Sequence, residues 1–490
     1  MRLSPFRNHS IRCLTALLIG MVVACRQSAR ADAPRLNVLF IAIDDLGNVL
    51  GRTRPPGLKT PHLDALAERG TFFERAYCQI PLCNPSRASV LTGRRPDATT
   101  VWDLDRHFRE QLPEVVTLPQ RFRQQGYHAA RVGKIYHYDV PRGIGTSGLD
   151  DEASWDQVVN PKGRDVDDEL QITNPTPLRP VSAAMCWLAA DGNDEEQTDG
   201  MIATAAIDLL AQLRDRPFFL GVGFFRPHTP YVAPRKYFDM YPLETIPLPD
   251  VPADDRDDIP PAAIPHNIPL PDYGIGEEDL KHSLQAYLAS VSFVDAQIGR
   301  VLDALDRLNL TNTTLVVLWS DHGYHLGEHH LWQKRTLYDP SARAPVIIAV
   351  PGAKSRGVAC QRVVEFIDLY PTTVDIALGD VPNNVDGRSL RPLLDDPQAE
   401  WDGVACTQIL RPGNDSPIMG RSITSDRWRY IEWSAGADGR ELYDQQSDPG
   451  ELHNVAENPA HADVIQRLRK QMRPRALGTT PATPFNRARL

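Results

Sequence analysis

Cysteine is scarce in this 490-residue chain, and an excess of positive charge is absent. Seven cysteines are too few for a disulfide scaffold, in which cysteine exceeds about 8–10% of the residues. There are 53 lysines and arginines against 63 aspartates and glutamates, so the net charge is −10. A general nucleic-acid binder needs a basic surface, and we therefore expect no nucleic-acid partner. A content of 42% hydrophobic and 24% charged residues excludes a disordered, collagenous or multi-span membrane protein.

Long hydrophobic runs are lacking too, except near the amino terminus. Residues 13–25 are almost wholly apolar and follow a basic start, but they are too few to span about 30 Å of hydrocarbon. This pattern is typical of a signal peptide, and Ala-Asp-Ala at 31–33 offers a cleavage site, so residues 1–33 are predicted to be one. The alternatives are a lipoprotein signal cut before Cys25, which would carry a lipid anchor, and an uncut hydrophobic anchor. All three predict an exported protein, either periplasmic or extracellular.

The rest of the chain alternates apolar, β-branched runs with amphipathic segments. A helix is predicted to begin with Thr60 as its cap and Pro61 as its first residue, and to stop at Gly70. Further helices are predicted at 118–125, 201–213 and 277–308, and strands at 37–43, 128–132, 217–225, 314–319 and 345–350. Strands that alternate with helices predict an α/β fold, with a large and mostly parallel central sheet flanked by helices.

Two segments interrupt this alternation. Residues 150–199 hold thirteen acidic and three basic residues, and residues 241–275 are rich in proline, so both are predicted to be surface loops. From about residue 396 the pattern becomes that of a small α+β subdomain with an antiparallel sheet. We therefore predict a catalytic domain at 34–395, a C-terminal subdomain at 396–475 and a tail at 476–490.

Acidic residues follow two of the predicted strands. Asp44 and Asp45 come after the first strand, and Asp321 and His322 follow the strand at 314–319. Ligands in open α/β sheets gather at the carboxyl ends of strands, and carboxylate oxygens select a hard cation such as Ca²⁺ or Mg²⁺. The two segments together therefore predict a metal site, although the first alone could be a turn that caps a helix.

A nearby motif has the spacing of a zinc site. His325, Glu328 and His329 match the pattern H-x-x-E-H, which needs both histidines on one face of a helix. Gly327 lies inside the motif, and the motif follows a strand end directly, so the zinc interpretation is disfavoured.

The segment Cys-Asn-Pro-Ser-Arg at 83–87 combines a thiol with a helix start. Pro85 permits a helix to begin at this point, and the amino terminus of a helix attracts anions. Arg87 adds planar donors suited to an oxyanion. The alternative is that Cys83 is a small buried side chain in front of a helix.

Cys-x-Pro-Ser-Arg followed by Leu-Thr-Gly at 91–93 resembles the signature of the sulfatase family, which implies an alkaline-phosphatase-like fold. The family's other motifs follow in order at Asp44-Asp45, Gly133-Lys134 with His137, Pro227-His228, Asp321-His322-Gly323, Lys334 and Glu441-Leu442-Tyr443-Asp444. The segments 92–97 and 321–334, with Trp102 and Asp103, are most similar to those of iduronate-2-sulfatases. Asn84 departs from that branch, whose animal members carry alanine there.

The resemblance implies that Cys83 is converted to Cα-formylglycine by a formylglycine-generating or anaerobic sulfatase-maturating enzyme. Its hydrate would attack sulfur and later expel sulfate. One Ca²⁺ per chain would be bound by Asp44, Asp45, Asp321 and His322, with the modified Cys83 facing it. The resemblance further implies roles for the other site residues: sulfate binding by Lys134 and Lys334, general acid catalysis by His228, a hydrogen bond to the formylglycine from His137, and orientation of the hydrate by Arg87.

These observations predict a sulfatase that acts on a sulfated oligo- or polysaccharide, with a 2-O-sulfated uronic acid as the leading substrate. Trp102, Asp103 and Arg106 are candidate sugar contacts. The alternatives are a formylglycine-dependent phosphonate monoester or phosphodiester hydrolase, and a sulfated-glycan-binding protein without catalysis. Cys78, Cys186, Cys360 and Cys406 allow at most two disulfide bridges, whose pairing the sequence leaves open.

Overall fold

The computed structural model of the protein describes residue 1 and residues 35–472. The predicted signal peptide, the alternative lipid anchor at Cys25 and the predicted tail at 476–490 lie outside the described residues. Residues 36–472 belong to one compact unit. Within the described part, no helix combines the length and the apolar character needed to cross a membrane.

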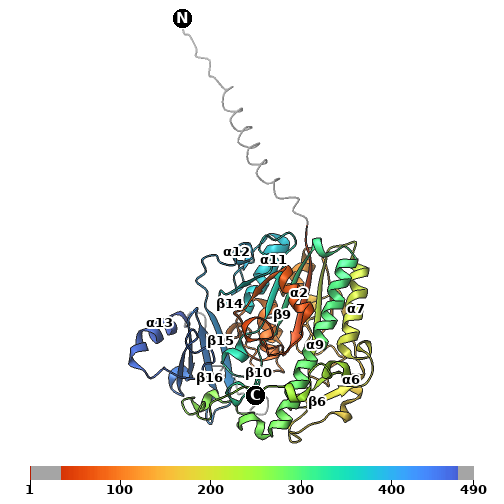
Figure 1. Ribbon diagram of the computed structural model, residues 1–490. Coiled ribbons are helices and arrows are strands. Elements are labelled where there is room, and N and C mark those ends of the chain that lie inside the picture. Colours follow the sequence, from red (N-terminus) through yellow and green to blue (C-terminus); the bar gives the residue numbers. More distant parts are fainter. Residues whose placement is uncertain (2–34, 473–490) are drawn as a thin grey trace. The chain divides into compact units, whose positions relative to one another are not determined.

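An eight-stranded sheet forms the centre of this unit, with the strand order β13-β2-β12-β9-β1-β7-β4-β5 (Figure 1). Its strands are β1 (Asn37–Asp44), β2 (Thr71–Phe73), β4 (His128–Gly133), β5 (Gln157–Val159), β7 (Phe218–Pro227), β9 (Thr314–Ser320), β12 (Val346–Ala349) and β13 (Val358–Cys360). From β9 to β5 all neighbours are parallel, as predicted. β12 is antiparallel to both β9 and β2, so the sheet is mixed on that side.

The central strand β1 is buried on both faces, which explains its continuous apolar sequence. Side chains alternate between the faces, so Leu39 and Ile41 pack in one core while Val38 and Phe40 pack in the other. The first core includes α7 (Thr198–Leu213) and α9 (Glu277–Arg307), which run side by side (Figure 1). The second core includes α3 (Cys83–Thr92), α5 (Leu118–Gln124) and α11 (Leu369–Leu378). The predicted helix α2 (Pro61–Arg69) has Thr60 as its N-cap and Gly70 as its C-cap, as expected.

The prediction of a surface loop at 150–199 is wrong in part. The segment contains β5 at the edge of the central sheet, α6 (Arg164–Asp167) and β6 (Trp187–Ala190), which pairs with β8 (Tyr231–Pro234). Its acidic residues are not all solvated, since the buried Asp165 accepts hydrogen bonds from the backbone of Thr198 and from Arg226. The segment at 241–275 consists of turns with short 3-10 helices, namely η6 (Leu243–Thr245), η7 (Pro261–Ala263) and η8 (Pro271–Gly274), which agrees with the prediction.

A second, antiparallel sheet lies in the C-terminal part, as predicted. Its order is β15-β16-β17-β18, with β15 (Ala405–Arg411), β16 (Ile418–Thr424), β17 (Trp428–Trp433) and β18 (Arg440–Asp444). The terminal helix α13 (Ala462–Met472) packs on it through Leu468, in a small core with Ile423 and Tyr430. The predicted boundary at residue 396 remains a prediction.

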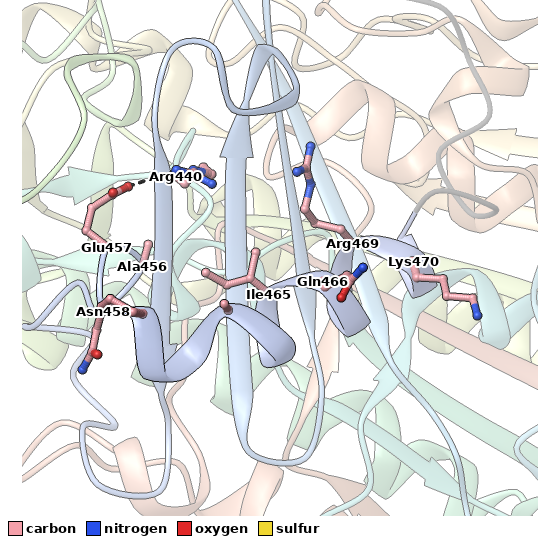
Figure 2. A pocket seen from close by; sticks show the side chains of 10 residues that line it. Arg440, Ala456, Glu457, Asn458, Ile465, Gln466, Arg469 and Lys470 are labelled. Carbon is pink, nitrogen blue, oxygen red and sulfur yellow. Dashed lines mark hydrogen bonds and ion pairs between the residues drawn. The ribbon is translucent and has the colours of Figure 1, made fainter.

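Figure 2 shows the side chains that line a hollow beside α13. The volume of this hollow is about 620 Å³. Two of its cations are paired, since Arg440 lies 3.3 Å from a carboxylate oxygen of Glu457 and Arg469 lies 2.9 Å from one of Glu432. No cysteine, histidine or serine is among its lining residues. This hollow therefore lacks the side chains that most often act as nucleophiles or general bases.

Buried ion pairs connect the C-terminal sheet to the rest of the unit. Arg429 on β17 is fully buried and donates to Glu451 at 2.6 Å and to Asp339 at 2.8 Å. Asp339 begins α10 (Asp339–Ala342) and also accepts from Arg343 at 2.6 Å and from the Tyr77 hydroxyl. Burial alone would raise the pKa of Asp339, but the charges of Arg343 and Arg429 hold it well below its usual value.

Replacing Arg429 by alanine should lower the free energy of unfolding by about 3–5 kcal/mol, because two buried carboxylates lose their partner. Denaturant unfolding measures this loss. Arg427→Ala is the matched control, since Arg427 pairs with Asp444 at the surface, and it should leave the midpoint unchanged. Equal effects of both variants would contradict the importance of the buried network.

Candidate active site

The carboxyl ends of β1 and β9 bring the predicted metal ligands together. The strands are parallel neighbours with Ile43 opposite Ser320, so the residues that follow leave the sheet at the same edge. The backbone N–H of Asp321 donates to the carbonyl of Ile43 at 3.2 Å, and the N–H of Asp45 donates to the Asp321 carboxylate at 3.1 Å. The acidic residues that follow β1 and β9 therefore lie together, as the sequence predicts.

Cys83 is the first residue of α3 and points into this edge. Its Sγ lies 3.4 Å from His322 Nε2 and 3.0 Å from Lys334 Nζ. The side chain is buried, and burial together with the nearby charge of Asp44 raises the pKa of the thiol despite Lys334. An unmodified Cys83 is therefore held as the neutral thiol, which is a poor nucleophile.

Two overlapping groups of metal-ligating atoms lie in this cluster. Each group has all its ligand atoms within 4.8 Å of one another, one from Asp45, Cys83, Asp321 and His322, the other from Asp44, Cys83 and His228. The Nδ1–H of His322 donates to the carbonyl of Gly323 at 2.9 Å, which leaves the lone pair of Nε2 directed at the cluster. A set dominated by carboxylate oxygens fits a hard divalent cation.

Three cations balance the three buried carboxylates. Lys134 Nζ lies 2.5 Å from an Asp44 oxygen, and Lys334 Nζ lies 2.5 Å from an Asp45 oxygen. Arg87, fully buried, bridges Asp44 at 3.2 Å and Asp321 at 3.0 Å. A divalent cation in the same place would leave an excess of two positive charges. The lysines could then turn from the carboxylates to an anionic ligand.

Burial and the neighbouring charges shift the pKa values of Asp44 and Asp45 in opposite directions. Burial would raise the pKa of Asp44, but the charges of Lys134 and Arg87 hold it well below its usual value. The pKa of Asp45 is raised, because its burial outweighs the charge of Lys334. Lys334 keeps its proton, since the charge of Asp45 raises its pKa against the effect of burial.

The position of Lys134 depends on the glycine before it. Gly133 ends β4 with φ of +69°, and a Cβ there would lie 2.2 Å from the carbonyl oxygen of Gly223. The N–H of Lys134 donates to that same carbonyl at 2.8 Å. Only glycine allows the backbone to approach the Gly223 carbonyl this closely. Gly133 is therefore needed to place Lys134 at the site.

Two histidines complete the cluster. The Nδ1–H of His228 donates to the carbonyl of Thr229 at 2.6 Å, so its Nε2, 3.8 Å from Asp45, is the atom that faces the site. His137 is also buried, and its Nδ1 has no hydrogen-bond partner among the described residues. Burial and the neighbouring lysines lower the pKa of both rings, so both are neutral without a ligand.

The candidate sugar contacts Trp102, Asp103 and Arg106 are tied to the site through Asn84 and a small apolar cluster. Trp102 packs with Leu82 and Leu410 in a small apolar cluster rather than lying exposed. The amide of Asn84 donates to the carbonyls of Asp103 at 3.0 Å and Arg106 at 2.8 Å. The asparagine that departs from the family pattern therefore holds the loop beside Cys83.

The H-x-x-E-H motif is not helical. His325 lies in β10 (His325–Leu326), and His329 has φ of +61°. His325 Nε2 is hydrogen-bonded to Thr336 and His329 Nδ1 to Asp255, so the zinc pattern is a coincidence of spacing, as expected. The five cysteines that the structure describes are free, so Cys78, Cys186, Cys360 and Cys406 form no bridge with one another.

One residue at the site was missed in the sequence. Tyr287 on α9 accepts a hydrogen bond from Gly47 N–H at 2.7 Å and donates one to the carbonyl of Asp45 at 3.0 Å. Asp45 has φ of +62°, a conformation that needs such support in a residue with a side chain. No local pattern marks a tyrosine 240 positions away from the loop that it holds.

Comparison with known protein families matches the chain over most of its length. Residues 36–379 match the family model described as Sulfatase, and residues 327–476 match the one described as N-sulphoglucosamine sulphohydrolase, C-terminal. The first match covers the strand ends and loops that carry the cluster, whereas the second covers only Lys334 among the cluster's residues.

Individual proteins agree with these matches. A sulfatase of Formosa agariphila is 32% identical over 92% of this chain and 90% of its own length. The iduronate 2-sulfatase of Homo sapiens is 30% identical over 95% of this chain and 99% of its own length. Among solved structures, a phosphonate monoester hydrolase from Silicibacter pomeroyi superposes with a TM-score of 0.73 and 25% identity, covering 91% of this chain and 96% of the other.

Replacing Tyr287 by phenylalanine should weaken the binding of a divalent cation, with Ca²⁺ as the probe, by about tenfold or more, because the loop that carries Asp45 loses both hydrogen bonds. Isothermal titration of the metal-free protein measures the affinity, without any need for turnover. Tyr370→Phe is the control, since the Tyr370 hydroxyl also donates to a backbone carbonyl, that of Val116, but lies outside the cluster. Unchanged affinity in Tyr287→Phe would rule out a positioning role.

Proposed function

The chain belongs to the sulfatase family, and we propose that this sulfuric ester hydrolase is exported and removes sulfate from a 2-O-sulfated uronic acid in a sulfated oligo- or polysaccharide. The observation that carries the proposal is the cluster itself, in which Cys83 lies among three carboxylates and three cations at one sheet edge. The similarity to an iduronate 2-sulfatase over almost the whole of both chains supports the choice of sugar. The apolar segment at 13–25 supports export.

The proposal includes two groups that the chain would acquire. Asp44, Asp45, Asp321 and His322 would hold Ca²⁺, and Cys83 would be converted to formylglycine by a maturation enzyme. When present, the ion neutralises the carboxylates and polarises the sulfate ester, and the hydrated formylglycine supplies a hydroxyl nucleophile. The buried thiol with a raised pKa supports the need for such a conversion.

Sulfate binding falls to the two lysines. Lys134 Nζ contacts Asp44 and Lys334 Nζ contacts Asp45, so each lysine reaches a different carboxylate of the cluster. Once the carboxylates have another counter-charge, the ammonium groups can hold the sulfate oxygens and stabilise the charge that develops there. Arg87 makes its bonds to Asp44, Asp321 and two backbone carbonyls, so it keeps the carboxylates in position.

Proton transfer to the leaving sugar oxygen is assigned to His228. Its Nδ1–H is engaged with a carbonyl, so Nε2 is the atom that can carry and release a second proton. The ring is neutral in the empty site because burial and Lys334 lower its pKa, and the negative charge of a bound ester would favour its protonation. His137, with an unpaired Nδ1, can donate to a group at position 83.

A phosphonate monoester hydrolase is the second candidate, because a solved structure of that activity superposes over most of both chains. Phosphonate monoesters and sulfate esters present similar tetrahedral anions to the same lysines. The segments at 92–97 and 321–334 favour the sulfate ester.

Replacing Cys83 by alanine should abolish turnover of 4-nitrophenyl sulfate, and EDTA should abolish turnover by the unchanged enzyme until Ca²⁺ is restored. Mass spectrometry of the protein from its own cells should find formylglycine at position 83, and a first residue at 34 or a lipid-modified Cys25. Full activity of Cys83→Ala would disprove the assignment of the nucleophile.

We expect a higher kcat/KM for a sulfate monoester than for a phosphonate monoester that has the same leaving group. Parallel assays with one purified sample measure this ratio. A preference for the phosphonate would establish the second candidate instead.

A further inference from the structure

Tyr273 contributes an unexplained hydroxyl beside the active site. The side chain is 92% buried, with 8% of its surface exposed, and its hydroxyl has no hydrogen-bond partner within the described part of the chain. Buried hydroxyls are nearly always paired, so such an exception indicates either a bound water or a ligand. Neither the proposed mechanism nor the packing of the core uses this group.

The backbone holds Tyr273 in an unfavourable conformation. Asp272 and Tyr273 are consecutive residues with φ of +51° and +58°. The Asp272 carboxylate accepts from His330 at 2.7 Å and from the Trp332 indole at 2.8 Å, which fastens the loop at 241–275 to the segment that leads to Lys334. Backbone strain that is kept by specific bonds is characteristic of functional sites.

Positive charges surround the ring. The guanidinium carbon of Arg179 lies 4.6 Å from the centre of the Tyr273 ring. Burial raises the pKa of the Tyr273 hydroxyl, and the charges of Arg179, Arg335 and Lys334 act against that rise. Lys334 itself lies 3.0 Å from Cys83 Sγ, so one of the charges that act on the tyrosine belongs to the cluster.

A further pair of arginines adds to this charge. Arg335 follows Lys334 with φ of +77°, and Arg411 ends β15 close to it. Arg411 is buried and donates to the carbonyls of Ala262 and Ala263, which carry no full charge. Burial and then the charge of Arg335 lower the pKa of Arg411 to about 9, so the two guanidinium groups repel one another. This side of the site is therefore suited to an anion separate from the sulfate.

We propose that Tyr273 and Arg335 form a subsite for the carboxylate of the sulfated sugar, with the Tyr273 hydroxyl as hydrogen-bond donor and Arg335 as counter-charge. The inference rests on the proposed function and adds a reason for the choice of a uronic acid. A carboxylate fits a guanidinium group better than a neutral ring hydroxyl does, because it is planar and charged. Arg179 and Arg411 strengthen the field without having to contact the sugar.

The test compares Tyr273→Phe and Arg335→Gln with the unchanged enzyme on three substrates. These are a 2-O-sulfated uronic acid disaccharide, its carboxyl methyl ester and 4-nitrophenyl sulfate. Each variant should lower the ratio of kcat/KM on the disaccharide to kcat/KM on 4-nitrophenyl sulfate by about tenfold, chiefly through KM. Each should also lose the preference for the free acid over the methyl ester. Tyr273→Phe removes no internal hydrogen bond, so its thermal unfolding temperature should not fall.

Tyr237→Phe is the control, because its hydroxyl bonds Asp194 away from the cluster, and it should leave both ratios unchanged. Unchanged ratios in Tyr273→Phe and Arg335→Gln, with normal turnover of the disaccharide, would overturn the subsite alone. An unchanged enzyme that hydrolyses 4-nitrophenyl sulfate but not the disaccharide would overturn the proposed substrate and the subsite together. Equal losses on all three substrates would assign the two residues to sulfate binding and also overturn the inference.

Discussion

Three carboxylates buried at one sheet edge are the constraint on which the rest of the site depends. Asp44, Asp45 and Asp321 leave two parallel strands side by side, and their mutual repulsion in a region of low dielectric is costly unless opposite charge is brought to them. Lys134, Lys334 and Arg87 bring that charge from three different parts of the chain. The fold of the loops around the sheet follows from the need to deliver these cations.

The positions of Lys134 and Lys334 depend on close contacts between backbone segments as well as on charge. Gly133 lets β4 turn against Gly223, so that Lys134 reaches Asp44. The left-handed residues at 329–335 carry Lys334 to Asp45 and are fastened to the proline-rich loop through Asp272. The site is therefore built by loops on a rigid sheet, which explains how three cations reach one buried cluster in a protein whose net charge is negative.

Particular elements show how far sequence patterns reach. The strand at 37–43, the helix from Pro61 and the cluster at Asp44 and Asp321 were predictable, because each depends on local periodicity or on the common edge of parallel strands. The segment at 150–199 was not, because its short elements β5 and β6 exist only through pairing with β4 and β8. The antiparallel direction of β12 relative to β9 could not be predicted either, since an apolar run has the same pattern in a parallel and an antiparallel strand.

The sequence by itself determined the chemistry available to this protein, namely a cysteine at a helix start, carboxylates at strand ends and ordered lysines and histidines. These features are encoded within a few residues each, so a pattern can carry them. Only the tertiary structure decided the role of Tyr287, which holds Asp45, and left the hydroxyl of Tyr273 without a hydrogen-bond partner among the described residues. Both depend on contacts between segments far apart in the chain, and burial and distance arise only when those segments pack.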